Sequence, residues 1–233
     1  MKLSRTDILY NKNFNPEKNF DLHDLPYSGE NPGVSIIFSI QDIPLEPINV
    51  ILDRKAFPAG VENFYKLASG QSIKSKTVVL PTRTYNQYQV RNYDRSICFI
   101  KKYNNIIIGG DIYKNNGLSS ASIYDDEAFP FEDPGFYYSH NQKGLLSLVP
   151  YLDQETGQLM YDSIFSMTLR DPDINNDILS LDESQVVIGK VSSGINVLNM
   201  INNALMPGQH KSQIIRVESM TPHRLFKREK PKI

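Results

Sequence analysis

The stretch CFIKKYNNIIIGGDIYKNNG, residues 98–117, contains two short apolar runs, a pair of adjacent glycines and a later Asn-Asn-Gly turn. The two runs are rich in the β-branched and aromatic residues that favour strands. Gly109 and Gly110 do not resemble a nucleotide-binding loop, because no Gly-Lys-Ser/Thr motif closes the loop and no long helical pattern follows it. The stretch therefore predicts two strands that end in a structural bend.

Similar strand patterns occur on both sides of this stretch, with one helical pattern before it and one after it. Residues 57–70 place apolar side chains at helical spacing, with Pro58 near the start and Gly70 as a C-terminal cap. Residues 194–205 predict a second helix. Its expected apolar face comprises Ile195, Leu198, Ile201 and Leu205. The expected strands are 34–40, 48–53, 77–80, 95–102, 104–110, 145–149, 163–169, 184–191 and 212–220, and residues 84–94 fit either a strand or a surface hairpin. This pattern predicts a mainly β fold, a closed or nearly closed barrel with helical caps.

The overall composition is that of a folded chain with balanced charge. Lys and Arg number 25 and Asp and Glu 26, for a net charge of −1, which argues against a nucleic-acid partner. No apolar run approaches the roughly 18–20 residues that cross a bilayer, and the N-terminus lacks a signal-peptide pattern. The one cysteine, Cys98, excludes an intrachain disulfide and is typical of a reducing compartment. We therefore expect a cytoplasmic protein without membrane or nucleic-acid partners.

No residue pattern predicts a metal, a cofactor or a catalytic nucleophile. The four histidines, His23, His140, His210 and His223, are far apart and are expected to lie on the surface. Residues 125–127 form an acidic cluster, for which a solvated turn is a better interpretation than a metal site. We expect neither a metal nor a cofactor.

The ends of the chain differ from its middle. Residues 1–33 are rich in Asn, Pro and Gly and predict an N-terminal extension, either a solvated arm or an arm that packs on a neighbour. The side chains available for such packing are Phe14, Phe20, Leu22, Leu25 and Tyr27. Residues 34–220 are expected to form the β-barrel domain, and residues 221–233 a basic, proline-containing tail.

Six segments resemble the cyclophilin family in their order and spacing. They are GVENFYKL, IIIGGDIYKNNG, SIYDDEAFPFEDPGF, KGLLSL, SIFSMT and LDESQVVIGKVSSGINVLNMI. The resemblance covers about residues 34–219 and agrees with the strand and helix pattern. It implies an eight-stranded antiparallel β-barrel capped by two α-helices, with cis–trans isomerisation of X-Pro peptide bonds as the typical activity.

The resemblance also implies that the site residues of the family are replaced on the first site strand. The family arginine corresponds to Lys101 when Phe99 is aligned, or to Ile100 when the Gly-Gly-Asp run is aligned. The pocket phenylalanine, methionine and glutamine correspond to Asn105, Ile106 and Ile108. Lysine keeps the charge of arginine but lacks its planar fork of donors. Lys101 is therefore expected to be a weak substitute for the catalytic arginine.

Further site positions follow along the chain by the same resemblance. The family Met-Ala-Asn corresponds to Leu148, Val149 and Pro150, the next glutamine to Ser163, a pocket phenylalanine to Phe165, the tryptophan to Ser180, the leucine to Leu181 and the histidine to Gln185. Phe165 and Leu181 keep the family residue, and both are equally well explained as barrel core. The predicted peptide groove comprises Ile106, Val149, Ser163, Phe165, Leu181 and Gln185.

These replacements predict a protein with little or no prolyl isomerase activity and with a binding, structural or assembly role. The alternative is an active isomerase that assists protein folding. The expected partner is a proline-containing peptide or protein, provided that the groove still binds, and the extensions are expected to mediate a homo-oligomer. The Asn-, Ile-, Lys- and Tyr-rich composition resembles that of AT-rich genomes, including those of giant DNA viruses. For such a source we expect a virion component.

Overall fold

A computed structural model of the chain describes residues 19–22, 31–70, 72–80, 83–101, 105–112, 120–124, 128–131, 137–172, 181–182, 185–204 and 213–224. Its strands are β1 (Pro32–Ile40), β2 (Ile43–Pro44), β3 (Ile48–Leu52), β4 (Ser72–Leu80), β5 (Arg83–Arg91), β6 (Ile97–Lys101), β7 (Ile106–Gly109), β8 (Phe129–Pro130), β9 (Leu145–Leu148), β10 (Tyr151–Leu152), β11 (Leu159–Tyr161), β12 (Phe165–Thr168), β13 (Val186–Ser193) and β14 (Ile215–Arg224). Its helices are α2 (Pro58–Ala68) and α3 (Ile195–Asn203).

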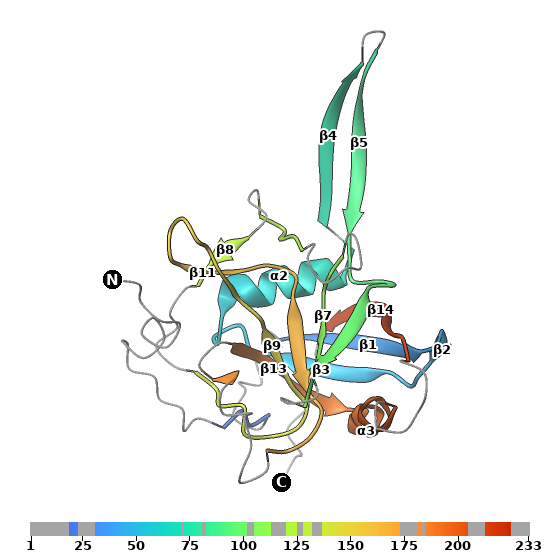
Figure 1. Cartoon of the computed structure of the whole chain (residues 1–233), viewed down its shortest axis with the longest axis vertical. Helices are drawn as coiled ribbons and strands as arrows, with labels where there is room; N and C mark the ends of the chain where they lie inside the picture. The colour runs from blue at the N-terminus through green and yellow to red at the C-terminus, as the bar shows by residue number, and fades with distance from the viewer. Residues whose placement is uncertain are drawn as a thin grey trace, which may run out of the picture.

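Among the described residues, nine strands form one sheet in the order β14-β6-β7-β12-β9-β13-β3-β1-β2. Because β1 also pairs with β14 along its whole length, the sheet closes on itself and β2 lies outside the ring. The remaining eight strands form the antiparallel barrel seen in Figure 1. The expected mainly β fold, an eight-stranded antiparallel barrel with two α-helices, is confirmed.

Alternating side chains fill the barrel interior, as the period of two in a strand requires. Val34, Ile36 and Phe38 of β1 are fully buried, and so are Val50 and Leu52 of β3. All five belong to one apolar core, to which the other barrel strands and both helices also contribute. This core holds the outer wall of the barrel in place, and the predicted site lies on that wall.

Helix α2 packs against β1 and β14. Its apolar residues Val61, Phe64 and Leu67 are fully buried in the barrel core. Pro58 occupies the first turn, where the backbone N–H has no helical partner, and Gly70 follows the helix with φ 63°, a conformation that favours glycine. The first predicted helix is thus confirmed with both of its end signals.

The second predicted helix is confirmed as α3, but its buried face differs from the expected one. Leu198 and Ile201 are fully buried, as expected, and Val197 is buried beside them. Ile195, the first residue of the helix, is 38% exposed, so it does not belong to the buried face. Leu205 lies outside the described residues.

Two smaller sheets accompany the barrel. β4 and β5 form a hairpin paired from Ser72↔Arg91 to Leu80↔Arg83, so the segment that fitted either a strand or a hairpin is the second strand of a hairpin. Figure 1 shows this hairpin projecting away from the barrel. β10, β11 and β8 form a three-stranded sheet, which the sequence did not predict because each of its strands has only two or three residues.

The last strand is longer than the sequence predicted. β14 continues to Arg224, whereas residues 221–233 were expected to form a tail. The added residues pair with residues 32–35 at the start of β1. Pro222 is tolerated there because β6 pairs only with the start of β14, which leaves the other edge without a described partner strand. Residues 225–233 lie outside the described part of the chain.

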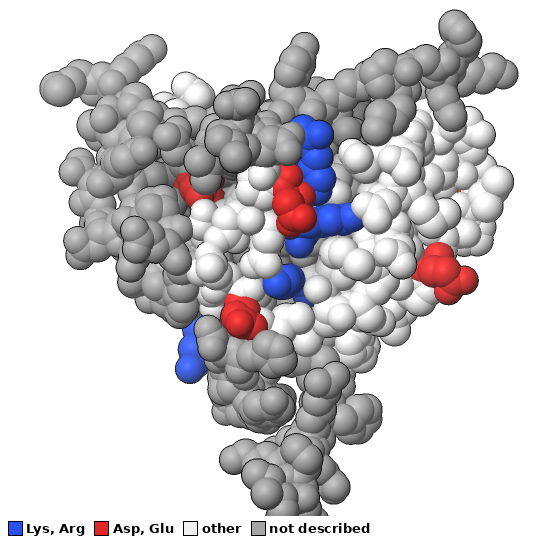
Figure 2. Space-filling view, turned by 90° about the horizontal axis from the view of Figure 1, so that it is seen from below, with Lys and Arg blue, Asp and Glu red and all other residues white. Residues whose placement is uncertain are grey.

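The described surface carries interspersed charges of both signs. On the face shown in Figure 2, Lys and Arg side chains lie beside Asp and Glu side chains, and the described residues form no patch of one sign there. Arg95 and Glu218, for example, pair at 2.5 Å. No helix in the described ranges is long and apolar enough to cross a membrane.

Candidate functional site

The strands that carry the predicted site lie side by side in the barrel wall. β6 pairs with β7, and β7 pairs with β12. The register places Lys101 opposite Ile106, and Ile108 opposite Ser166. Directly opposed residues point to the same face of a sheet, so Ile106, Ile108 and Ser166 share the outer face. Ile107, between the two other isoleucines, points into the barrel core.

Two predicted groove residues and the neighbouring Ile108 form an apolar cluster outside the barrel core. Ile106 and Leu181 are 0% and 3% exposed, and the half-buried Ile108 packs against them. Leu181 comes from a short described turn, residues 181–182, that lies far from β7 in sequence. Of the three side chains only that of Ile108 is partly exposed, and none of the three carries a hydrogen-bond donor.

Lys101 is the last residue of β6. Its backbone pairs with Ile106, so this chain position lies at the margin of the apolar cluster. Only the backbone of Lys101 is described. Lys101 thus lies at the end of a predicted strand next to the cluster, and its role as a substitute for the arginine stays a prediction.

Phe165 faces the barrel interior rather than the outer wall. It is fully buried, and its ring centroid lies 5.6 Å from that of Phe64 and 5.5 Å from that of Tyr93. The sequence left open whether Phe165 lines the pocket or belongs to the barrel core, and in the structure it belongs to the core. The next residue, Ser166, occupies the outer face, and its hydroxyl donates a hydrogen bond to Gln185 Oε1. Gln185 is thus in contact with Ser166, which is itself buried.

Ser163 and Val149 lie close to the bend that follows β7. The Ser163 hydroxyl donates to the Gly110 carbonyl at 2.5 Å and accepts from the Ala121 N–H at 3.2 Å. Ser163 is fully buried, so in this structure it holds the bend rather than facing solvent. Val149 is half-buried, and its N–H donates to the Ile164 carbonyl at 3.1 Å.

The predicted bend is confirmed at Gly110, which has φ 104°. A Cβ on Gly110 would lie 2.1 Å from the Ser163 carbonyl oxygen, so the position requires glycine for both its conformation and its space. The two adjacent glycines therefore serve the path of the chain.

A buried Asp–His–Ser chain lies beside this face, and the sequence did not predict it. His140 Nδ1 lies 2.5 Å from Asp182 Oδ1, and His140 Nε2 lies 2.7 Å from Ser147 Oγ. Asp182 also accepts hydrogen bonds from the Ser139 hydroxyl and the His140 N–H, each at 2.7 Å. The carboxylate favours a proton on Nδ1, which leaves Nε2 as the acceptor for the Ser147 hydroxyl.

This arrangement resembles that of serine hydrolases, but it has no access to a substrate. His140 and Ser147 are 0% and 1% exposed, and Ser147 lies within β9 between β12 and β13. The chain of hydrogen bonds instead joins the turn that carries Leu181 to the barrel wall. The expectation that His140 lies on the surface was wrong, and the separated positions of the three residues gave no local signal for their contact.

Asp162 is a second buried carboxylate, one residue before Ser163. Burial raises its pKa, and hydrogen bonds from the Ser120 hydroxyl and the Ile164 N–H oppose this effect. Burial, and then the charge of Asp162, raises the pKa of Tyr93. Neither group was predicted from the sequence, because both are polar residues without a recognisable motif.

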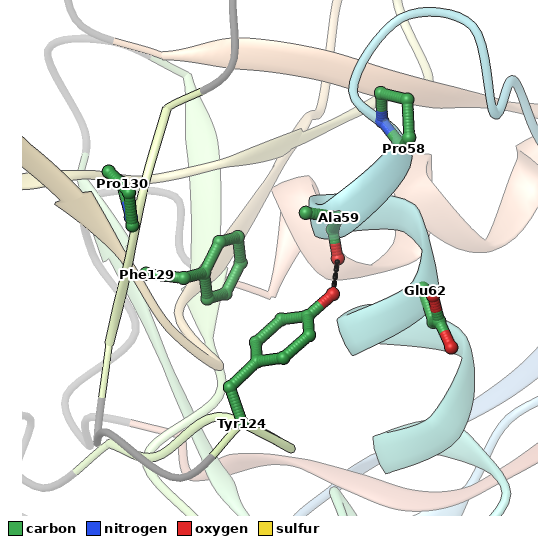
Figure 3. Close-up of a pocket in the computed structure, with 6 residues that line it drawn as sticks. All are labelled: Pro58, Ala59, Glu62, Tyr124, Phe129 and Pro130. Atoms are coloured by element: carbon green, nitrogen blue, oxygen red, sulfur yellow. Dashed lines mark hydrogen bonds between the residues drawn. The ribbon is translucent and has the colours of Figure 1, made fainter.

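A pocket of about 380 Å³ lies elsewhere, at the start of α2. It is lined by Pro58, Ala59, Glu62, Tyr124, Phe129 and Pro130. Figure 3 shows Tyr124 and Phe129 facing the helix, with the Tyr124 hydroxyl donating to the Ala59 carbonyl at 3.0 Å. None of the predicted groove residues lines this pocket.

No group of His, Cys, Asp and Glu side chains in the described ranges could hold a metal ion. The acidic cluster at residues 125–127 lies outside these ranges, as do His23 and His210.

Comparisons with known proteins agree with this geometry. Residues 36–221 match the family model described as cyclophilin type peptidyl-prolyl cis-trans isomerase/CLD. The chain is 41% identical over 189 residues to the "Structural PPIase-like protein L605" of Acanthamoeba polyphaga mimivirus, covering 81% of this chain and 80% of that protein. It is 33% identical over 113 residues to the E3 SUMO-protein ligase RanBP2 of Pan troglodytes, covering 48% of this chain and 3% of that protein.

A solved structure, the mimivirus cyclophilin, superposes with a TM-score of 0.69 at 36% identity, covering 89% of this chain and 96% of that one. The viral relatives agree with the giant-virus source that the composition suggested. The chain belongs to the cyclophilin-type peptidyl-prolyl cis-trans isomerase family.

Proposed function

We propose that this chain is a cyclophilin-fold binding or structural protein with little or no prolyl isomerase activity. The observation that carries the proposal is the apolar cluster of Ile106, Ile108 and Leu181 on the outer wall. By the family resemblance, position 108 should carry a glutamine that donates hydrogen bonds to the substrate backbone. The isoleucine at this position has no donor to offer.

Isomerisation makes and breaks no covalent bond. The enzyme can therefore accelerate it only by holding the rotating amide, for example through hydrogen-bond donors. Its barrier of about 18–20 kcal/mol arises from the amide resonance that is lost during rotation. A catalyst must therefore bind the twisted amide better than the planar forms. Removing one preorganised donor typically costs about 10²–10³ in rate in other enzymes. Replacing both the arginine and the glutamine is expected to remove most of the acceleration.

Binding of a peptide without isomerisation requires fewer hydrogen-bond donors than catalysis does. Ile108, the partly exposed member of the cluster, stabilises a bound proline ring by about 25 cal/mol for each Å² of apolar surface removed from water. Ser166 and Gln185 add polar atoms beside this surface. A proline-containing peptide or protein is therefore the partner that we propose for the groove.

The name of the mimivirus relative, a structural PPIase-like protein, supports a non-catalytic role. By this analogy we propose a place in a virion or in the cytoplasm, with the extensions as contacts between copies. Sedimentation of the full chain across a range of concentrations tests whether the extensions mediate contacts between copies. A monomer at every concentration would exclude such contacts.

The direct test of the proposed function is cis–trans exchange on a short X-Pro peptide, followed by NMR exchange spectroscopy with catalytic amounts of protein. We expect no acceleration, together with shifts in the resonances of Leu181 and Gln185 when the peptide is in excess. Family membership favours the second candidate, an active isomerase. Exchange at the efficiency of typical family members would establish that candidate, and Lys101→Ala would then show whether Lys101 supplies the donor.

A further inference from the structure

The described part of the N-terminal extension, residues 19–22, packs against the outer wall of its own barrel. Phe20 is 1% exposed, and its ring centroid lies 4.5 Å from that of Tyr138 at an interplanar angle of 48°. The surrounding cluster is separate from the barrel core. We call its barrel residues the phenylalanine socket, which comprises Ala56, Tyr138, Leu145 and Val187.

The backbone of the arm is bound as well as its ring. The Phe20 carbonyl accepts hydrogen bonds from Gln142 Nε2 at 2.9 Å and from Lys190 Nζ at 3.4 Å. Lys190 Nζ also donates to Gln142 Oε1 at 2.6 Å, so the two barrel side chains hold each other in position. The Asn141 amide donates to Asn19 Oδ1. The arm is thus recognised through one aromatic side chain, one carbonyl and one amide.

The socket is held in shape by contacts that do not involve the arm. The Tyr138 hydroxyl donates to Asp53 Oδ2 at 2.6 Å, and Asp53 is itself buried. Leu145 and Val187 belong to β9 and β13, which pair directly in the barrel. A site with its walls fixed in advance loses little conformational entropy when a segment binds.

We propose that the phenylalanine socket is a second peptide-binding site of this chain, and that it accepts residues 19–22 of another copy as well as its own. Every feature that the socket recognises is present in each copy of the arm. The tether gives the chain's own arm an effective concentration in the mM range, so the arm of a second copy enters when the socket's own phenylalanine is missing. The proposal is independent of whether the groove binds or isomerises prolyl peptides.

The test uses ¹⁵N-labelled full-length Phe20→Ala, which keeps the socket residues and lacks the buried ring that fills the socket. Unlabelled wild-type chain is titrated into it, and the amide resonances of Tyr138, Val187 and Lys190 are followed. The matched control is unlabelled Phe20→Ala, which differs from the wild type only in the side chain that should bind. A synthetic peptide of residues 17–24, with and without Phe20→Ala, is titrated in parallel.

We expect the wild-type chain and the Phe-containing peptide to shift the socket resonances, with at least tenfold weaker binding for both Ala controls. Equal shifts with both chains, or no shift with the wild-type chain up to mM concentrations, would overturn the proposal. Binding of the peptide without binding of the chain would overturn exchange between copies. If Phe20→Ala does not fold, labelled wild-type chain takes its place, and the Phe-containing peptide in excess over the mM effective concentration of the chain's own arm should displace that arm and shift the same resonances, whereas no shift would overturn the proposal.

Discussion

The side chain of Ile108 lies opposite Ser166 on the outer wall, where the family pattern has a glutamine. We predict that Lys101→Arg combined with Ile108→Gln raises cis–trans exchange on an X-Pro peptide at least tenfold, because each restored donor is worth about 10²–10³ in other enzymes. NMR exchange spectroscopy measures this rate. Ile195→Gln on the exposed start of α3 is the matched control and should leave the rate unchanged. A folded double variant without any gain would show that the missing donors do not limit the rate.

His140 is the central residue of the buried Asp182–His140–Ser147 chain. Replacing it with alanine leaves a buried carboxylate and a buried hydroxyl without their ring partners. Each unsatisfied group costs about 1–3 kcal/mol, so we expect the free energy of unfolding to fall by at least about 2 kcal/mol. Urea denaturation measures the change. His140→Ala with Asp182→Ala should cost less than the sum of the two single variants, and strict additivity would contradict the coupling.

Asp162 makes stability depend on pH, because burial raises its pKa in the folded chain. A raised pKa means that the folded state holds the proton more tightly than the unfolded state. The resulting stabilisation is present below the unfolded pKa and is lost as pH rises through the folded pKa. Asp162→Asn should therefore unfold at higher urea concentration than the wild type at pH 7, and the difference should vanish toward pH 3. If Asp162→Asn is equally destabilised at both pH values, the hydrogen bonds of the carboxylate contribute more to stability than its protonation does.

Two single residues show what could not be predicted from the sequence. The family motif placed Phe165 in a pocket, but a strand alternates its faces, and one position separates the interior from the outer wall. The register with β7 settles the matter, since Phe165 lies opposite Gly109 and Ser166 opposite Ile108. His140 was missed for a different reason. Its carboxylate partner, Asp182, lies 42 positions away, and no periodicity connects such residues.

At the scale of elements, local pattern was sufficient for the helices and the barrel strands. Helix α2 follows from its apolar spacing and its end signals, and β1 follows from a run of β-branched and aromatic residues. The pattern fails for strands as short as β8 and β10, because two residues carry no period. It also fails at the end of β14, since the partner that extends this strand is the distant start of β1.

Gly110, in the bend after β7, and Gly157, between β10 and β11, offer a matched pair of glycine variants. Gly110 has φ 104°, and an added Cβ would lie 2.1 Å from the Ser163 carbonyl oxygen. Gly157 has φ 69°, and an added Cβ would meet nothing within 4 Å. We predict that Gly157→Ala costs about 1–2 kcal/mol of unfolding free energy, from conformation alone, and that Gly110→Ala costs more, because the backbone must also move. Equal urea midpoints for the two variants would contradict the steric part of this account.

At the scale of the whole molecule, residues 137–142 connect the two candidate binding surfaces. Tyr138 and Gln142 contact the arm at the phenylalanine socket. Ser139 and His140, between them, bind Asp182 next to Leu181. One short segment is therefore shared by the socket and by the turn that completes the apolar cluster. Along this segment, the two residues that bond Asp182 lie between the residues that contact the arm.

The β4–β5 hairpin stands apart from this connected body, since no other strand in the described ranges pairs with it. A two-stranded hairpin on its own is marginally stable in water. We therefore predict that backbone amides of residues 72–91 exchange with deuterium about a hundredfold faster, or more, than those of β9 and β12, because the hairpin opens without unfolding the barrel. Hydrogen exchange with mass spectrometry on dilute protein measures both. Equal protection at every concentration would mean that the hairpin is held by its own chain. Protection that grows with protein concentration would place the hairpin in a contact between copies.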